Sequence, residues 1–335
     1  MEVDTSPAPI VFSSPGLKEN DTRLLAFYQE FHVHYSILKK HSPHFRRLMD
    51  SPEKSNLVQD GFQYNWVTKI DPLEVDGLDW HLISTNDYVG KKELGPDPSD
   101  LDESINIEWE QKCFEALLRA FYEMPYQVES YEKMKSLTTM ADYYCCCPTI
   151  SRTLNNAIFH FDNSEWYFNV QQNSGRFLEL AIKLRNSTLF RDALILHVGN
   201  WGDDMDSHAN WIDNRDLLKI VETARSKIAV LVAKVLKIGF EGKQGATQLL
   251  NKHRAMATYL GEYALAKHIR FIMEDSTLDN SDVLTEIRPA MRKLLDCKLA
   301  FGTNCVAGSE NYPHHFLCAE IEDDELPWDT SAVDF

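Results

Sequence analysis

Hydrophobic and polar residues alternate from Asp21 to Ser36, over the stretch DTRLLAFYQEFHVHYS. The chain reverses near Tyr28 to Glu30 in this pattern, which predicts a β-hairpin with a tight turn. The segments SILKKHS and SPHFRRLM follow and predict two short helices. Ser42 is expected to cap the second helix, because Pro43 then takes the first helical position, where its missing N–H costs nothing.

The periodicity fails from about Ser51 to Ser104, where Pro, Gly, Asp and Asn are frequent. Within this stretch, short strands are indicated at Trp66 to Ile70 and at Trp80 to Ser84. A loop of this length is unusual inside a compact domain. We therefore predict an insertion at about 51–104.

Helical periodicity returns after a short strand predicted at Ile105 to Ile107. The segment EWEQKCFEALLRAFYEM has an apolar face typical of a helix, and Pro125 is expected to stop it. The segments ESYEKMKSLTTMADYY and PTISRTLNNAIF predict two more helices, the second beginning at Pro148.

After Phe161 the pattern is almost entirely helical, with a pair of helices followed by a long helix from about Asn214 to Ile238. The predicted fold class is α+β: a small sheet covered by helices, followed by an all-helical C-terminal domain. The expected organisation is a flexible leader at 1–20, an α+β domain at 21–160 with the insertion, a helical domain at 161–319 and an acidic tail at 320–335.

The net charge of the chain is −17 and its pI is about 5.1. Phosphate backbones and anionic lipid repel such a chain, so we expect neither a nucleic-acid partner nor a membrane-surface role. The N-terminus shows no secretory signal, and the apolar run from Ile228 is short and contains two lysines. The expected location is therefore the cytoplasm or the nucleus.

Several motifs in order resemble a BTB/POZ domain. The family's Asp, strand, tight turn, Phe-x-Val-His, aliphatic-Leu pair and Ser-Pro-x-Phe are matched by Asp21, TRLLAF, YQE, FHVH, Ile37-Leu38 and SPHF. Its later helices are matched by FEALLRAFYEMPYQVE and LTTMADYYCCCPTISRTLNNAI. The resemblance covers roughly residues 20–160, and the helical remainder resembles the C-terminal part of filamentous-fungal BTB proteins.

The resemblance implies a non-catalytic protein–protein interaction module that binds another protein or a second copy of itself, without a cofactor. It implies structural roles for Asp21, Phe31, His34, Leu38, Ser42, Phe45, Phe114, Leu118, Tyr122, Ala141 and Asp142. It also suggests an interaction surface that includes Leu24, Phe27, Phe45, Leu48 and Met49. Some of these five apolar residues must instead belong to the core.

An alternative within this family is a substrate adaptor of a cullin-type ubiquitin ligase, with the helical half holding the substrate. Cullin-binding members carry a hydrophobic-x-Glu element after the Ser-Pro-x-Phe helix, and here LMDSPE is only a loose approximation. Two further departures are Tyr35, where a basic residue is usual, and YEMPY, which lacks the family's turn glycine. Direct DNA binding is not expected, because the sequence shows neither the cysteine and histidine spacing of a zinc finger nor a stripe of basic residues.

Histidines and cysteines suggest an alternative of another class, a zinc-binding protein or metalloenzyme. The residue types suit zinc at the C-terminal end, where the candidates are Cys297, Cys305, His314, His315 and Cys318. These spacings match no zinc module, so packing is the preferred interpretation, as it is for His32 and His34 on the hairpin. The same holds for the run Cys145 to Cys147, whose side chains would diverge on a helix.

Enzyme motifs give no mechanism, because the chain has no phosphate loop, nucleophile elbow or HExxH sequence. The acidic segment EIEDDELPWDTS at the C-terminal end allows two interpretations. It is either a short linear binding peptide or a tail that Trp328 attaches to the helical domain. The second is preferred, because an indole is more stable buried than exposed.

Overall fold

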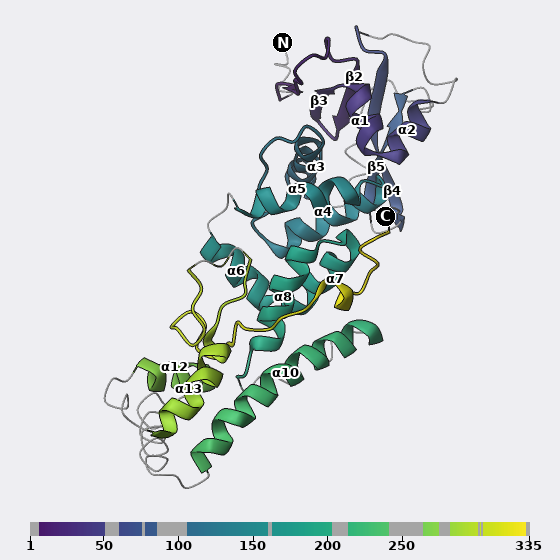
Figure 1. Cartoon of the computed structure of the whole chain (residues 1–335). Coiled ribbons are helices and arrows are strands. Elements are labelled where there is room, and N and C mark those ends of the chain that lie inside the picture. The colour runs from purple at the N-terminus through teal and green to yellow at the C-terminus, as the bar shows by residue number, and fades with distance from the viewer. Residues whose placement is uncertain are drawn as a thin grey trace. The chain divides into compact units, whose positions relative to one another are not determined.

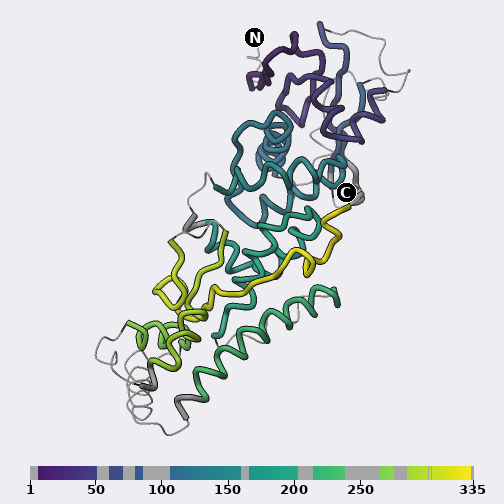
Figure 2. Tube along the Cα trace, viewed as in Figure 1, coloured from purple at the N-terminus to yellow at the C-terminus, as the bar shows by residue number. Residues whose placement is uncertain are grey.

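The computed structural model of the chain describes residues 7–50, 60–75, 78–85, 106–159, 163–202, 214–240, 264–274, 282–300, 302 and 304–332. The chain forms two compact units, Met1–Phe161 and Asp162–Phe335 (Figure 1). Figure 2 follows the same path as a Cα trace, which runs from purple in the first unit to yellow at the C-terminal end.

A β-hairpin begins the first unit, as the alternation of the sequence predicts. Its strands are β2 (Thr22–Ala26) and β3 (Gln29–Val33), and they pair antiparallel. The turn lies at Phe27 and Tyr28, slightly earlier than predicted. Phe27 turns the chain in the left-handed region with φ of 55°, and its ring is fully buried.

The hairpin is the centre of a five-stranded sheet in the described residues, with the order β1-β3-β2-β4-β5. The short β1 (Ile10–Val11) pairs parallel with β3. β4 (Tyr64–Val75) pairs parallel with β2 and antiparallel with β5 (Leu78–Ser84). Parallel pairing of β2 and β4 requires a crossover, which two helices supply.

The crossover helices are α1 (Tyr35–His41) and α2 (Pro43–Met49), which confirms the two short helices predicted from the sequence. Ser42 caps α2 as expected: its Oγ accepts a hydrogen bond from the backbone nitrogen of Phe45 at 3.0 Å. The same hydroxyl donates to the carbonyl of Tyr144 at 2.6 Å. Ser42 therefore joins α2 to the end of a helix about 100 residues later.

Two predictions for the middle of the first unit are wrong. Ile107 does not belong to a short strand; it begins α3 (Ile107–Phe121), which Asn106 caps. The two strands indicated at Trp66 to Ile70 and at Trp80 to Ser84 are confirmed as β4 and β5, but they are longer than predicted and belong to the sheet, so the stretch 51–104 is not an insertion throughout. Residues 51–59 and 86–104 lie outside the described residues.

The core of the first unit lies between one face of the sheet and the helices. A row of side chains crosses all five strands on this face: Ile10, Phe31, Leu24, Trp66 and Ser84. Phe31 contacts Phe114 of α3 edge to face at 5.5 Å, and Phe45 of α2 packs against Trp66. The helices α4 (Tyr131–Tyr143) and α5 (Cys147–Phe159) pack on α3.

The second unit is helical over most of its described length. Its helices are α6 (Asn163–Gln172), α7 (Ser174–Leu184), α8 (Ser187–Gly199), α10 (Arg215–Phe240), α12 (Leu265–Glu274) and α13 (Asp282–Leu295). The predicted helix pair is confirmed as α7 and α8, which pack together. The predicted long helix is confirmed as α10, which packs on α8 and α13.

The prediction of an all-helical C-terminal domain is wrong after Leu295. In the described residues from 296 to 332, the chain is extended or turning apart from the 3-10 turn η5 (Asp323–Glu325). The buried carboxylate of Asp192 on α8 holds this segment, since its Oδ1 accepts from the backbone nitrogen of Ala300 at 2.8 Å. Its Oδ2 accepts from the hydroxyl of Tyr167 on α6 at 2.7 Å.

Among the helices that the structure describes, none is long and apolar enough to cross a membrane.

Candidate interaction surface

The outer face of the sheet in the first unit carries a polar row. The residues Val11, His32, Arg23 and Asn65 lie side by side on β1, β3, β2 and β4. Side chains alternate along each strand, so this row faces away from the row that enters the core. The sheet therefore presents one apolar face to its helices and a second face of different chemistry.

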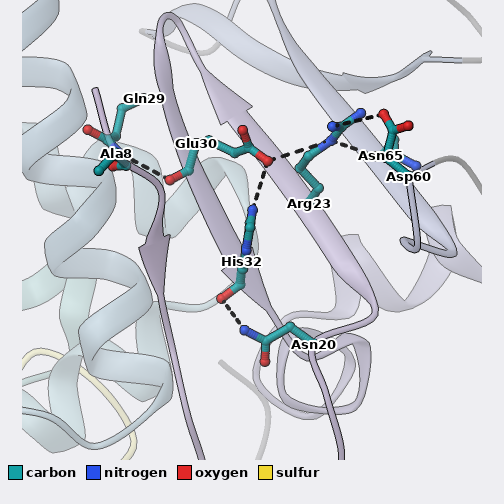
Figure 3. Close-up of polar contacts among 8 residues, drawn as sticks. All are labelled: Ala8, Asn20, Arg23, Gln29, Glu30, His32, Asp60 and Asn65. Carbon is teal, nitrogen blue, oxygen red and sulfur yellow. Dashed lines mark hydrogen bonds and ion pairs between the residues drawn. The ribbon is translucent and has the colours of Figure 1, made fainter. Parts of the chain in front are cut away.

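Glu30 and Arg23 organise the polar contacts on this face (Figure 3). The Oε1 of Glu30 lies 2.7 Å from Nε2 of His32 and 3.9 Å from Nε of Arg23. The guanidinium of Arg23 also donates to Oδ1 of Asn65 at 2.8 Å and to Oδ2 of Asp60 at 3.4 Å. Polar side chains thus connect β2, β3, β4 and the turn at Asp60 on one side of the sheet.

Phe62 shields this cluster from water. Its ring centroid lies 4.6 Å from that of His32, and the guanidinium of Arg23 sits 5.6 Å from it. The side chains of Arg23 and His32 are only 17% and 19% exposed. Contacts between a cation and an aromatic face strengthen as water is removed, so the partial burial of Arg23 favours its contact with Phe62.

An open pocket of about 400 Å³ lies next to the cluster. Its lining combines apolar and polar side chains: Val11, Phe12, Ser13, Ser14, Leu17, Lys18, Glu19, Asn20, His32, His34 and Phe62. Val11 and Leu17 are 62% and 40% exposed, whereas Phe12 is buried against Tyr122. The lining of the pocket thus combines a buried aromatic side chain with two exposed aliphatic side chains.

His34 is one of the lining residues, and its ring is fully engaged. Its Nε2 lies 2.9 Å from the carbonyl oxygen of Lys18, so this nitrogen carries a proton and donates it. Its Nδ1 lies 2.9 Å from the hydroxyl of Tyr122, which also accepts from the His34 backbone nitrogen at 2.7 Å. His34 packs at the junction of sheet and helices, as predicted. His32 lines the same pocket, but its partner differs, because its ring bonds to Glu30.

Asp21 joins three elements at the start of the hairpin. Its Oδ1 accepts from the backbone nitrogen of Tyr35 at 2.7 Å, at the beginning of α1. Its carbonyl oxygen accepts from the backbone nitrogens of Gln63 and Tyr64, at the beginning of β4. An aspartate here satisfies helix donors that would otherwise lack a partner.

The interaction surface predicted from the resemblance is wrong for four of its five residues. Leu24, Phe27, Phe45 and Met49 are at most 1% exposed, and Leu48 is half-buried. Apolar periodicity identifies the side chains that must be buried. It does not show whether the same chain or a partner protein buries them. Here other parts of the same chain cover them, as when Phe27 packs on Trp80 and Phe45 on Trp66 and Tyr144, so these residues form core and cannot meet a partner.

The other residues singled out by the resemblance are mostly buried. Phe31, Leu38, Ser42, Phe114, Leu118 and Ala141 are 0% exposed. Tyr122 is half-buried, and Asp142 is exposed. His41, the last residue of α1, is also buried and stacks on Phe121 with ring centroids 5.6 Å apart. Burial lowers the pKa of the His41 imidazole, because the charged form loses water.

The C-terminal cysteines and histidines do not form a metal site. Among the described residues, which include all five candidates, no three His, Cys, Asp or Glu side chains are gathered to hold an ion. The thiol of Cys297 contacts the carbonyl of Gly302 at 3.7 Å, and that of Cys305 contacts the hydroxyl of Tyr312 at 3.4 Å. His315 is buried, and burial raises the pKa of the Cys318 thiol to about 11. Zinc chemistry on this set is therefore not supported.

The three consecutive cysteines do not lie on one helix as predicted: α4 ends at Tyr143 and α5 begins at Cys147, so Cys145 and Cys146 lie between the two helices. Cys146 and Cys147 are buried, whereas Cys145 is exposed with φ of 51°. Burial raises the pKa of the Cys146 thiol well above its usual value, which favours the uncharged thiol. Packing explains Cys146 and Cys147, but not Cys145, which lies at the turn between α4 and α5.

Sequence reasoning missed the residues that build this surface, which include Val11, Leu17, Arg23, Asp60 and Phe62. For Arg23 a signal was present. Side chains alternate along a strand, so Arg23 must point to the other face of the sheet from its neighbour Leu24. For Asp60 and Phe62 no local signal exists, because they reach Arg23 through the pairing of strands about 40 residues apart.

The sequence matches no protein-family model, and neither a curated protein nor a solved structure matches it.

Proposed function

We propose that the first unit is a protein–protein interaction module of the BTB/POZ type, which binds a second copy of the chain or another protein. The observation that carries the proposal is the path of the chain from β2 to β4. A hairpin, two short helices and a parallel return strand follow one another, and Asp21 bonds to both the first helix and the return strand. The motif residues that carry the resemblance thus hold together the elements of this path.

The contact surface in this proposal is the pocket beside β1. Its rim exposes Val11 and Leu17, and exposed aliphatic side chains gain free energy when a partner covers them. The polar cluster of Arg23, Glu30 and His32 lies next to it and supplies charged groups at the border. An apolar centre with a polar rim is the usual anatomy of a protein interface.

A binding role fits the chemistry of the pocket better than a catalytic one. The ring of His34 is held by a carbonyl and a hydroxyl, and the ring of His32 is held by Glu30. These contacts fix the surface in place. No cofactor is needed for a function of this kind.

Self-association is tested by sedimentation velocity of the purified full-length chain over a wide range of concentration. The variant Val11→Glu/Leu17→Glu should lower the fraction of dimer or larger species at least tenfold, because it places charge on the apolar rim. The matched control is Met124→Glu, which charges another exposed apolar residue of the same unit. Equal association of both variants would show that the pocket is not the interface.

Partner binding is tested by purifying the tagged chain from its native cell and identifying what accompanies it by mass spectrometry. A cullin with its RING partner, lost in the Val11→Glu/Leu17→Glu variant, would identify a ligase adaptor. A set of proteins without any cullin would identify a scaffold. A chain that stays monomeric at high concentration and brings no partner contradicts the proposal.

A further inference from the structure

The acidic tail of the second unit is bound to that unit's own helices. In Figure 1 it is the yellow segment that runs beside α8, passes through the turn η5 and continues beyond it. Leu326 is 8% exposed, and the ring of Trp328 meets Phe190 of α8 edge to face at 5.5 Å. The prediction that Trp328 attaches the tail to the helical domain is confirmed.

Two basic side chains hold the acidic part of the tail. Arg191 of α8 donates to the carbonyl of Ile321 at 3.3 Å and pairs with the carboxylate of Asp323. Lys227 of α10 lies 2.9 and 3.1 Å from the two carboxylate oxygens of Glu325. The tail is thus recognised through its negative charge as well as through its apolar residues.

Both ion pairs are at the surface. The side chain of Asp323 is 81% exposed and that of Lys227 is 52% exposed. Exposed pairs are weak and screened by salt. The tail is therefore held by contacts that a competing ligand of the same chemistry can replace.

The tail does not fill the groove in which it lies. A cavity of about 230 Å³ remains between α10 and the tail, lined by Lys219, Ile220, Thr223, Ala224, Lys227, Glu320, Ile321 and Glu325. The α10 side offers two lysines beside the apolar Ile220 and Ala224. The opposite side is the tail itself.

The same face of α10 continues past the tail. Lys219, Thr223, Lys227, Val230 and Lys234 follow one another at intervals of three or four residues, so they form one stripe along the helix. We call these five residues the α10 stripe. Val230 within it is 54% exposed.

The charge of α10 is unlike that of the whole chain, and the lysines that α10 gathers on one face correct the expectation that the chain has no basic stripe. The helix carries six basic and two acidic residues, and no acidic residue follows Glu222 within it. The chain as a whole has a net charge of −17. A basic helix face on an acidic protein favours an acidic partner locally, while the overall field repels a long polyanion such as nucleic acid.

We propose that the α10 stripe is a docking surface for an acidic peptide segment of a partner protein, and that the chain's own tail occupies part of it as a competitor. The tail sequence EIEDDELPW shows the chemistry of the ligand: consecutive carboxylates with aliphatic and indole anchors. Such a partner segment would bind Lys219 and Lys227 once the tail is displaced and would extend onto Val230 and Lys234. This inference concerns the second unit and does not rest on the function proposed for the first.

The test uses the full-length chain and a fluorescein-labelled peptide of sequence EIEDDELPWDT, followed by fluorescence anisotropy. In the wild type, the attached tail is present at a high effective concentration and should suppress peptide binding. The variant Asp323→Asn/Glu325→Gln weakens the tail's contacts with Arg191 and Lys227. It should bind the peptide about tenfold more tightly than the wild type.

Further variants separate the α10 stripe from general charge effects. In the variant with the weakened tail, Lys227→Ala/Lys234→Ala should remove the gain in affinity. The control Lys293→Ala removes an exposed lysine of α13, outside the stripe, and should keep the gain. Circular dichroism checks that each variant is folded.

Three results would overturn the proposal. One is equal affinity of the wild type and the weakened-tail variant for the peptide. Another is equal binding of a control peptide in which every Asp and Glu is replaced by Asn and Gln. The third is tighter binding of a single-stranded oligonucleotide than of the acidic peptide, which would assign the stripe to a different class of ligand.

Discussion

The hydroxyl of Tyr122 lies 2.7 Å from the backbone nitrogen of His34 and 2.9 Å from its Nδ1. Tyr122 follows the last residue of α3, and His34 precedes the first residue of α1. One side chain thus fixes where the hairpin ends and α1 begins. Burial raises the pKa of this phenol well above its usual range, so the hydroxyl keeps its proton for the bond to the imidazole.

Replacement of Tyr122 by Phe should destabilise the first unit by about 1–3 kcal/mol. The backbone nitrogen and Nδ1 of the nearly buried His34 both lose their hydrogen-bond partner in this variant. The free energy of unfolding in urea measures this change. The control is Tyr28→Phe, which removes a hydroxyl from an exposed residue of the hairpin turn and should have little effect. Equal stability of the two variants would show that the Tyr122 hydroxyl does not hold the junction.

Replacement of Ser42 by Ala removes a helix cap and a buried contact together. The carbonyl of Tyr144 and the backbone nitrogen of Phe45 both lose their bond to the hydroxyl. We expect a loss of about 1–3 kcal/mol in the free energy of unfolding and faster hydrogen exchange of the α2 amides. Ser36→Ala, at an exposed position of α1, is the matched control. Unchanged exchange in α2 would contradict the capping role.

Local signals in the sequence were enough for the features that depend on neighbouring residues. The hairpin, the Ser42 cap and the long helix α10 each follow from a pattern within a few residues of the chain. The turn at Phe27 is different, because a left-handed backbone conformation usually favours Gly or Asn. The buried hydroxyl of Thr68 makes it possible here, since it accepts from the Phe27 nitrogen at 2.6 Å.

Pairing between distant segments could not be predicted. β2 pairs with β4 only as far as Val67, and β4 continues to Val75 because β5 pairs with its remaining length; neither neighbour is visible in the sequence of β4 itself. The candidate surface depends on the same pairing, since Arg23 reaches Asn65 across β2 and β4. The apolar pattern identified Phe45 and Met49 as residues that must be buried. Only the packing of α2 against the rest of the unit decides that the chain itself buries them.

The carboxyl of Asp50 should titrate below its usual value of 3.8, because hydrogen bonds from Lys39 and then from Tyr35 favour its charged form. A lowered pKa in the folded state means that this group stabilises the fold above its unfolded pKa. The contribution is lost as the pH falls through the folded value. Carbon-detected NMR titration of Asp50 measures the shift.

The variant Lys39→Met should return the Asp50 pKa toward its usual value, and high salt should do so in part because the pair is exposed. Lys40→Met, on the next residue of α1, is the control and should leave Asp50 unchanged. A normal titration of Asp50 in the wild type would show that the contact with Lys39 is not maintained in solution.

At Gly199, the last residue of α8, the helix comes close to the backbone of the C-terminal segment. A Cβ at this position would lie 2.0 Å from the carbonyl oxygen of Phe316, whose backbone nitrogen donates to the Gly199 carbonyl at 2.9 Å. Gly199→Ala should therefore separate the two backbones and destabilise the second unit by about 1–3 kcal/mol or more. Hydrogen exchange of peptides covering 187–202 and 314–317 measures the loss.

The control is Gly175→Ala on α7, where a new Cβ meets only the side chain of His197 at 3.5 Å, an ordinary contact. Alanine favours a helix over glycine by about 0.5–1 kcal/mol, so this variant should be as stable as the wild type or slightly more so. The two substitutions have the same chemistry and opposite expected signs. If both destabilise equally, the close approach of Gly199 to Phe316 is not what holds the C-terminal segment against α8.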